Sequence, residues 1–177
     1  YHALPGEPRH ETPTFARSNA WEATRQEVCA VREGVGINEV QNFGKYRVTG
    51  PKAREWLDRI MAGSIPKPGR LSLTPMLAHS GKIIGDFTVS CLSETEFQLT
   101  ASYGAQGWHQ RWFDQNAMEG VRVENISDAR SGFQIAGPKA RELLSRVTRS
   151  DVSAEAFRFM DVHRMTVGMA NCIVQRV

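Results

Sequence analysis

Asp86 is the residue whose type and position most suggest chemistry. It lies in the segment GKIIGDFTV, residues 81–89, where a run of apolar residues predicts a β-strand. Aspartate is disfavoured in strands, so its presence here suggests a function. In that interpretation, the carboxylate accepts a proton or stabilises a positive charge. A solvated aspartate, or one paired with a neighbouring strand, explains the same pattern, and the residues alone favour that second interpretation.

The alternation of side chains along a strand assigns the neighbours of Asp86 to two faces. The residues expected on its own face are Ile84, Thr88 and Ser90. Those expected on the opposite face are Ile83, Phe87 and Val89. The face of Asp86 is therefore the more polar of the two.

The cysteines and histidines do not form a recognisable site. Cys29, Cys91 and Cys172 are widely spaced, with no CxxC pair and no histidine at a zinc-binding spacing. Their number and spacing predict reduced thiols in a cytosolic compartment, and their apolar surroundings favour structural roles. The five histidines are dispersed, and none has another histidine at i+3 or i+4. The sequence therefore predicts neither a metal site nor a catalytic cysteine.

Composition limits the class of protein. The 177 residues are 41% hydrophobic and 23% charged, which suits one globular domain or two small ones. The 22 basic and 19 acidic residues give a net charge of +3 and are scattered, so no nucleic-acid partner is expected. No apolar run reaches transmembrane length, and the first residues do not resemble a signal peptide, so no membrane association is expected.

The hexapeptide GPKARE occurs twice, at residues 50–55 and 137–142. Each copy follows a strand-like run and precedes a matched apolar pattern, which predicts a strand-to-helix corner with helices starting at Pro51 and Pro138. Such a corner can bind phosphate, but one glycine per turn, without GxxxxGK[ST] or GxGxxG, favours an architectural role. The copies therefore indicate one unit used twice.

Around the first copy the sequence predicts the order β-α-β-β-β-α-β, close to the split βαβ unit of ferredoxin-like folds with one extra strand. A helix over 20–33, stopped by Gly34, is expected before it. A second helix over 107–118 is expected to present an aromatic core face formed by Trp108, Trp112 and Phe113. Residues 1–20 contain three prolines and are expected to be a linker or arm.

The second copy starts again near Phe133. Because Gly50 and Gly137 are 87 positions apart, a complete second unit would run well past Val177. We therefore expect a piece of a longer polypeptide, with an incomplete second lobe whose last apolar strand lacks a sheet partner. The predicted class is α+β, with a linker or arm at 1–20, a first lobe with its leading helix at 21–130, and the start of a second lobe at 131–177.

Three ordered segments carry a family resemblance. They are VREGVGINEVQNFGKYRVTGPKAREWLDRI, PGRLSLTPMLAHSGKIIGDFTVSCL, and AGPKARELLSRV followed by FRFMDVHRMTV. Together they resemble the glycine-cleavage T-protein (aminomethyltransferase) family, most closely the folate-binding halves of dimethylglycine and sarcosine dehydrogenases, over about residues 20–177. The resemblance implies a T-protein-like multi-lobed arrangement, in which the two GPKARE copies are scaffold corners of successive lobes.

The resemblance also implies a function. A one-carbon (methylene) unit from a small N-methylamine would pass to tetrahydrofolate, and in the dehydrogenases an upstream FAD domain, not contained in these residues, would oxidise the amine. The family's functional aspartate lies in a GG-x-x-x-D-hydrophobic-x-V segment, which GKIIGDFTV matches at Asp86. As the catalytic residue, Asp86 would take the proton that a folate nitrogen loses as it captures a methylene iminium, and would stabilise the cation.

Several positions of the expected folate pocket depart from the family pattern. The family's tyrosine is replaced by Leu73, an asparagine by Ala78, and the pocket asparagine after the third strand by Ser102. Phe43 replaces another familiar residue, and either stacks on a flat ring or serves as a core aromatic beside Tyr46. The residues predicted to bind the folate cofactor are Phe43, Leu73 and Ser102.

Two functions remain open at this point. The first is a tetrahydrofolate-dependent one-carbon transfer region of an N-methylamine-oxidising dehydrogenase or an aminomethyltransferase, whose 177 residues alone are expected to be inactive. The second is a non-catalytic folate-binding or regulatory module, favoured by the lost pocket polarity. A purely structural repeat protein would leave the Asp86 segment unexplained. The expected location is the cytoplasm, or the mitochondrial matrix in a eukaryote.

Overall fold

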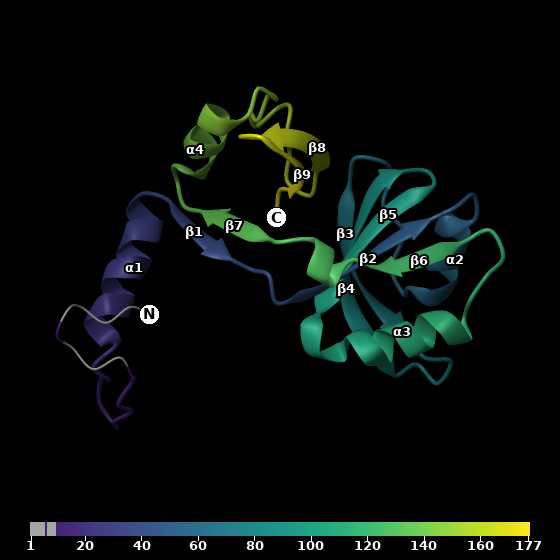
Figure 1. Cartoon of the computed structure of the whole chain (residues 1–177), viewed down its shortest axis with the longest axis horizontal. Helices are drawn as coiled ribbons and strands as arrows, with labels where there is room; N and C mark the ends of the chain where they lie inside the picture. The colour runs from purple at the N-terminus through teal and green to yellow at the C-terminus, as the bar shows by residue number, and fades with distance from the viewer. Residues whose placement is uncertain (1–5, 7–9) are drawn as a thin grey trace.

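The computed structural model describes residue 6 and residues 10–177, which form two sheet-containing lobes (Figure 1). The larger, first lobe contains a five-stranded antiparallel sheet in the order β3-β4-β5-β2-β6. Its strands are β2 (Phe43–Thr49), β3 (Leu71–Leu77), β4 (Ile83–Ser93), β5 (Glu96–Ser102) and β6 (Arg122–Asn125). Its helices are α2 (Ala53–Ile60) and α3 (Gln106–Gln115), with short 3₁₀ turns at Tyr103–Ala105 and Ser127–Ala129.

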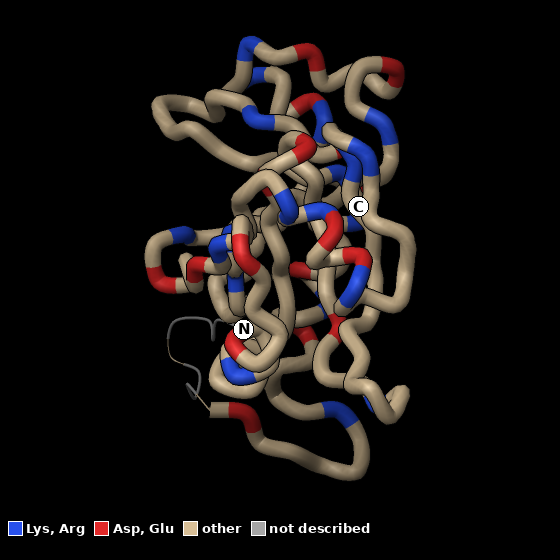
Figure 2. The backbone as a smooth tube through the Cα atoms, turned by 90° about the vertical axis from the view of Figure 1, so that its right-hand side faces the viewer, with Lys and Arg blue, Asp and Glu red and all other residues tan. Residues whose placement is uncertain are grey.

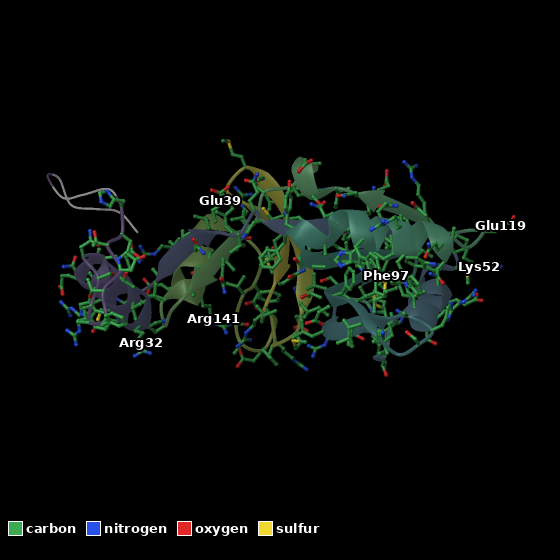
Figure 3. The ribbon with its side chains drawn as sticks, turned by 90° about the horizontal axis from the view of Figure 1, so that it is seen from below. Arg32, Glu39, Lys52, Phe97, Glu119 and Arg141 are labelled. Atoms are coloured by element: carbon green, nitrogen blue, oxygen red, sulfur yellow. The ribbon has the colours of Figure 1, made fainter. Side chains whose placement is uncertain are left out.

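Both helices pack on the same face of this sheet. Trp56 and Leu57 of α2 and Phe113 of α3 join one buried cluster with strand residues such as Tyr46 and Phe97. Phe97 lies inside the first lobe in Figure 3. The amphipathic helices therefore bury one face of the sheet and leave the other without a helix.

The second lobe is smaller. Its elements are β7 (Phe133–Ala136), α4 (Ala140–Val147), β8 (Val162–Val167) and β9 (Ala170–Gln175). Strands β8 and β9 form a hairpin, and β7 pairs antiparallel with β1 (Gly36–Glu39), which follows α1 (Trp21–Glu33). The core of this lobe is limited to Val152, Phe157 and Met165, with partly buried neighbours.

The predicted order of elements in the first lobe is confirmed. Strands β5 and β6 are both antiparallel to β2, which lies between them, so β5-α3-β6 is a split βαβ unit and β3 is the extra strand. The leading helix ends at Glu33, and Gly34 is its C-cap, as the sequence indicated. Figure 2 shows acidic and basic positions interspersed along the backbone.

The two GPKARE segments form equivalent corners. Gly50 and Gly137 adopt φ values of 131° and 117°, a region that favours glycine. The backbone N–H of Ala53 donates to the carbonyl of Gly50 at 3.1 Å, and that of Ala140 donates to Gly137 at 3.0 Å. The helices begin at Ala53 and Ala140, two residues later than predicted, because the Pro-Lys pair completes this turn before the helix starts.

The predicted aromatic face of α3 is partly wrong. Trp108 is 51% exposed and lies near the guanidinium of Arg111, whereas His109 is 1% exposed and takes a core position with Phe113. His109 and Phe113 are four residues apart and share a helix face that Trp108 does not. Trp112 packs at the edge of the core as expected.

Three further points concern the ends and limits of the chain. The prediction for residues 1–20 lies outside the described residues at 1–5 and 7–9, and residues 10–20 contain no helix or strand. The division of the chain into a first lobe at 21–130 and a second lobe at 131–177 stays a prediction. Within the described part of the chain, no helix is long and apolar enough to cross a membrane.

Candidate active site

The helix-free face of the five-stranded sheet, here called the open face, carries all four residues predicted to form the site. Directly paired residues of neighbouring strands share a face. Asp86 pairs with Pro75, Leu73 with Thr88, and Phe43 with Ser102. Leu73 is 69% and Phe43 40% exposed, and Asp86 and Ser102 are exposed as well. Phe43 is therefore not the core aromatic that one interpretation of the sequence allowed.

A β-bulge changes the faces predicted for the residues before Asp86. Met76 pairs with Gly85 but Leu77 pairs with Ile83, so Ile84 is an extra residue in β4. Ile84 consequently joins the core, at 9% exposure, while Ile83 is 69% exposed. The prediction that Ile84 shares the face of Asp86 is wrong, because strict alternation does not survive a bulge.

Close packing between β4 and α3 explains why the residue before Asp86 is a glycine. A Cβ at Gly85 would lie 2.5 Å from Nε2 of His109, which reaches this strand from α3 on the core side. The backbone of β4 can therefore approach α3 closely only with glycine at this position. The Gly-Asp pair of the motif thus combines a buried contact with a side chain on the open face.

His109 itself belongs to a buried polar pair. Its Nδ1 lies 3.1 Å from the hydroxyl of Tyr46. Burial lowers the pKa of His109 and raises the pKa of Tyr46 to about 12, so both groups are neutral near pH 7. The tyrosine hydroxyl and the imidazole nitrogen form one hydrogen bond, and the pair satisfies two polar groups inside the core.

Asp86 has no hydrogen-bond or ion-pair partner among the described residues. Its neighbours on β3 are Pro75, directly across, and Leu73, two positions along, and Thr88 follows two positions along β4 itself. Thr88 in turn pairs with Thr100 of β5. The carboxylate is therefore exposed and uncommitted on a surface of mixed apolar and hydroxyl side chains.

The second lobe covers the other end of the open face. Gln175 of β9 donates from Nε2 to Oγ of Ser90 at 2.8 Å, and Arg164 of β8 forms a 2.7 Å ion pair with Glu96. Leu71, at that end of β3, is only 3% exposed. Asp86, four residues from Ser90 along β4, lies beyond this contact and stays accessible.

Lys45 is a member of the open face that the sequence analysis did not identify. It pairs with Thr100 and is 6% exposed, and its Nζ donates to the carbonyls of Gln41 at 3.0 Å and Phe43 at 3.1 Å. Burial lowers the pKa of Lys45, and the charge of Asp128 acts in the opposite direction. Lys45 thus fixes the backbone that carries Phe43. Alternation from Phe43 places it on this face, but no sequence signal shows its burial.

The cysteines and the best-defined cavity do not contribute to the candidate site on the open face. Among the described residues there is no group of three or more His, Cys, Asp or Glu side chains that could hold a metal ion. The three cysteines are unpaired, and Cys91 is buried while Cys29 and Cys172 are partly buried. A cavity of about 200 Å³ lies on the helix side of the sheet, lined by Ala78 and by residues such as Arg59 and Trp112. Ala78 is therefore separated from the open face.

Comparison with known proteins adds sequence and structural relatives. Residues 7–177 match the family described as "GCVT N-terminal domain". The chain is 31% identical over 166 residues to human mitochondrial dimethylglycine dehydrogenase, covering 92% of this chain and 19% of that protein. It is 33% identical over 124 residues to an aminomethyltransferase of Natranaerobius thermophilus, covering 69% of this chain and 34% of the relative. The chain therefore spans only a fifth to a third of these relatives.

Two solved structures share the fold. The aminomethyltransferase T of the glycine cleavage system from Bartonella henselae superposes with a TM-score of 0.68 at 21% identity, covering 77% of this chain and 37% of that one. A chain of the heterotetrameric sarcosine oxidase from Corynebacterium sp. U-96 gives a TM-score of 0.63 at 18% identity, covering 92% and 82%. The α+β arrangement of this chain thus occurs in both proteins.

Proposed function

The chain belongs to the GCVT N-terminal domain family, and from this membership we propose that it is the tetrahydrofolate-dependent one-carbon transfer region of an N-methylamine-oxidising dehydrogenase or an aminomethyltransferase. The observation that carries the proposal is the exposed, uncommitted carboxylate of Asp86 on the open face. Among the described residues, Asp86 makes no hydrogen bond or ion pair that would give it a structural role, although aspartate is disfavoured in strands.

The residues around Asp86 fit a flat, partly polar ligand. Phe43 and Leu73 offer exposed apolar surface at the same end of the sheet, and Thr88 and Thr100 offer hydroxyl groups between them. In this proposal Phe43 stacks on the pterin ring, Ser102 donates a hydrogen bond, and Lys45 holds the Phe43 backbone in place.

Asp86 has two tasks in the proposed reaction. Tetrahydrofolate, when bound, supplies the amine nitrogen that receives the one-carbon unit. Asp86 takes the proton from that nitrogen as a general base, and its negative charge stabilises the positively charged one-carbon donor. Because the carboxylate has no competing partner in the described residues, it can serve both tasks without first breaking an ion pair.

The proposal places this chain within a longer enzyme. In a dehydrogenase, an upstream FAD domain would oxidise the N-methylamine, and no residue of this chain is assigned to FAD. We propose a cytoplasmic location, or the mitochondrial matrix in a eukaryote, in keeping with the unpaired cysteines and with the name of the human relative.

A second candidate is a non-catalytic folate-binding or regulatory module. The observation in its favour is Leu73, an apolar side chain 69% exposed on the edge strand β3 of the open face, where the family pattern has a hydrogen-bonding tyrosine. A module of this kind would bind folate on the same face but would not need the charge of Asp86.

The Asp86→Asn variant separates these candidates. Measured in the intact enzyme, the variant should form 5,10-methylenetetrahydrofolate about 10² to 10⁴ times more slowly, because the amide keeps the shape but loses basicity and charge. Asp58→Asn, at an exposed position of α2, is the matched control and should change neither rate nor folding. Unchanged transfer with unchanged folate affinity in Asp86→Asn would end the case for Asp86 as the catalytic residue. Folate binding without transfer in the wild type would favour the binding module, and absence of folate binding in the wild type would reject tetrahydrofolate-dependent transfer.

A further inference from the structure

The sheet holds the part of β4 that carries Asp86 from one side only. The ladder between β4 and β5 begins at Thr88, so Asp86 lies outside it and pairs only with Pro75 of β3. Proline has no N–H to donate, and β3 is an edge strand of the sheet. The bulge at Ile84 also interrupts the β3–β4 ladder just before Asp86. The position of Asp86 therefore depends on what packs behind this segment.

His109 of α3 lies directly behind it, on the core side of β4. A Cβ at Gly85, the residue before Asp86, would lie 2.5 Å from Nε2 and 3.0 Å from Cδ2 of His109. The imidazole centroid lies 4.7 Å from the ring centroid of Phe87, the residue after Asp86. With 1% of its surface exposed, His109 thus packs against both chain neighbours of Asp86.

Tyr46 takes a similar position behind Phe43. A Cβ at Gly44, the residue after Phe43, would lie 3.2 Å from the hydroxyl oxygen of Tyr46. The tyrosine is 0% exposed. Its hydroxyl therefore lies against the backbone of β2 at the residue next to Phe43, and glycine at that residue allows the close approach.

One hydrogen bond joins these two buried side chains, here called the Tyr-His pair. The hydroxyl oxygen of Tyr46 lies 3.1 Å from Nδ1 of His109, and the two rings meet edge to face at 72°. Phe113 packs edge-on against Tyr46, with 5.1 Å between the ring centroids. The pair thus extends on the core side of the sheet from Gly44 to Gly85, and each glycine is next to a residue of the candidate site.

The hydrogen bond gives the Tyr-His pair a defined length. Two apolar side chains in its place would pack together, but their contact has no preferred direction, whereas a hydrogen bond restricts both distance and angle. Burial lowers the pKa of His109 and raises the pKa of Tyr46 to about 12. Both members therefore stay neutral near pH 7, and their separation does not vary with protonation in that range.

We propose that Tyr46 and His109 are positioning residues for the open face, where the Tyr-His pair sets the spacing between Phe43 and Asp86. The inference rests on the proposed function, in which Phe43 stacks on the pterin ring and Asp86 takes a proton from the folate nitrogen. A general base acts only within hydrogen-bonding reach of its proton, and a misplacement of about 1 Å can lower a rate by about 10². The pair touches no ligand and acts through Gly44 and Gly85.

Tyr46→Phe tests the proposal, because it removes the hydroxyl and keeps the ring. In the intact enzyme, kcat for methylene transfer to tetrahydrofolate should fall by about tenfold or more, since the carboxylate of Asp86 is no longer aligned. The KM for tetrahydrofolate should change by less than about threefold, because the groups that bind the ligand are all retained.

Thr74→Val is the matched control. It removes another buried hydrogen bond from the core side of the sheet, the one that the N–H of Gly63 donates to Oγ1 of Thr74 at 2.7 Å. Thr74 is 1% exposed, so the loss of stability should resemble that of Tyr46→Phe. Because Thr74 contacts neither glycine of the Tyr-His pair, kcat and KM should stay at their wild-type values.

A double variant separates positioning from stability. Tyr46→Phe with His109→Leu removes both polar partners, so no buried group is left without a hydrogen bond, and the melting temperature should recover relative to Tyr46→Phe. We expect kcat to stay low in the double variant. If kcat returned together with the melting temperature, or if Tyr46→Phe alone kept the wild-type kcat, the pair would have a structural role only and the proposal would be overturned.

Amide chemical shifts of the ligand-free protein test the same spacing without any assay of transfer. Tyr46→Phe should shift the amides of Gly85 and Asp86, which lie on the far strand, and Thr74→Val should not. If the wild-type enzyme transferred no methylene unit, the proposed function would fail, and these shifts would then decide. A shift at Asp86 in Tyr46→Phe would uphold the spacing role, and its absence would overturn it.

Discussion

Each lobe contains a strand-to-helix corner with the same GPKARE sequence, but the helices that follow the two corners are buried to different extents. Helices α2 and α4 have eight residues each, follow the same glycine conformation and end with the same hydrogen bond, from the capping residue to Leu57 in one and Leu144 in the other. Yet α2 has four buried residues and α4 has none. The local sequence therefore determines the corner, whereas burial differs because the described part of the second lobe has no strand in the place of β5.

The comparison also distinguishes the residues that build the scaffold from those proposed for the site. The hairpins β3-β4 and β8-β9 each contain six consecutive pairs, which begin with Leu71–Ser90 and Val162–Gln175. In this alignment the counterpart of Asp86 is Asn171, and the counterpart of Leu73 is Arg164. The residues of GPKARE are identical in both lobes, but the residues proposed for the site differ. Repetition thus identifies the residues that build the corner, and a site residue is found among the positions where the lobes diverge.

The largest expected difference between the lobes lies at two equivalent leucines. Leu57 is 0% exposed within the main core, and Leu144 is only partly buried. Leu57→Ala should lower the free energy of unfolding by about 2–5 kcal/mol, and Leu144→Ala by about 1 kcal/mol, because the side chain at 144 has less packing to lose. Urea unfolding of both variants gives the two values. Equal costs for the two leucines would mean that the second lobe is packed as fully as the first, and the contrast between the lobes would be lost.

A smaller effect is expected where the lobes meet. Gly69 and Met160, each two residues before its hairpin, have positive φ values of 79° and 65°, a conformation that methionine disfavours. Gly69→Ala should destabilise the protein by about 1 kcal/mol, since no atom blocks the new Cβ and the cost is conformational. Met160→Gly should stabilise it by up to about 1 kcal/mol, less what the partly buried side chain contributes. Thermal melts of both variants measure the pair, and a change of the same sign in both would contradict the equivalence.

The sequence allowed the first lobe to be predicted almost completely, because its strands and helices have strong alternation, helical spacing and turn residues. It could not predict the bulge at Ile84, which depends on pairing with β3. It also could not show that α1 and β1 join the second lobe, because their partner Ala136 lies 100 positions beyond Gly36. Such long-range pairing leaves no local pattern.

The candidate site, too, could be predicted only in part from the sequence. Asp86 stood out because a strand aspartate is unusual, and its position on the open face follows from alternation on the C-terminal side of the bulge. Lys45 was missed because its burial results from two carbonyls, at Gln41 and Phe43, that fold over it. A hydrogen bond to a main-chain carbonyl carries no sequence signature.

The proposed chemistry lies on the open face of the first lobe and not on the equivalent face of the second. Amide chemical shifts, recorded by NMR during titration with tetrahydrofolate up to millimolar concentration, distinguish the two faces. We expect shifts at Leu73, Asp86 and Ser102, while the counterparts Arg164 and Asn171 stay unchanged. Shifts of equal size in both lobes, or none at Asp86, would place the chemistry elsewhere.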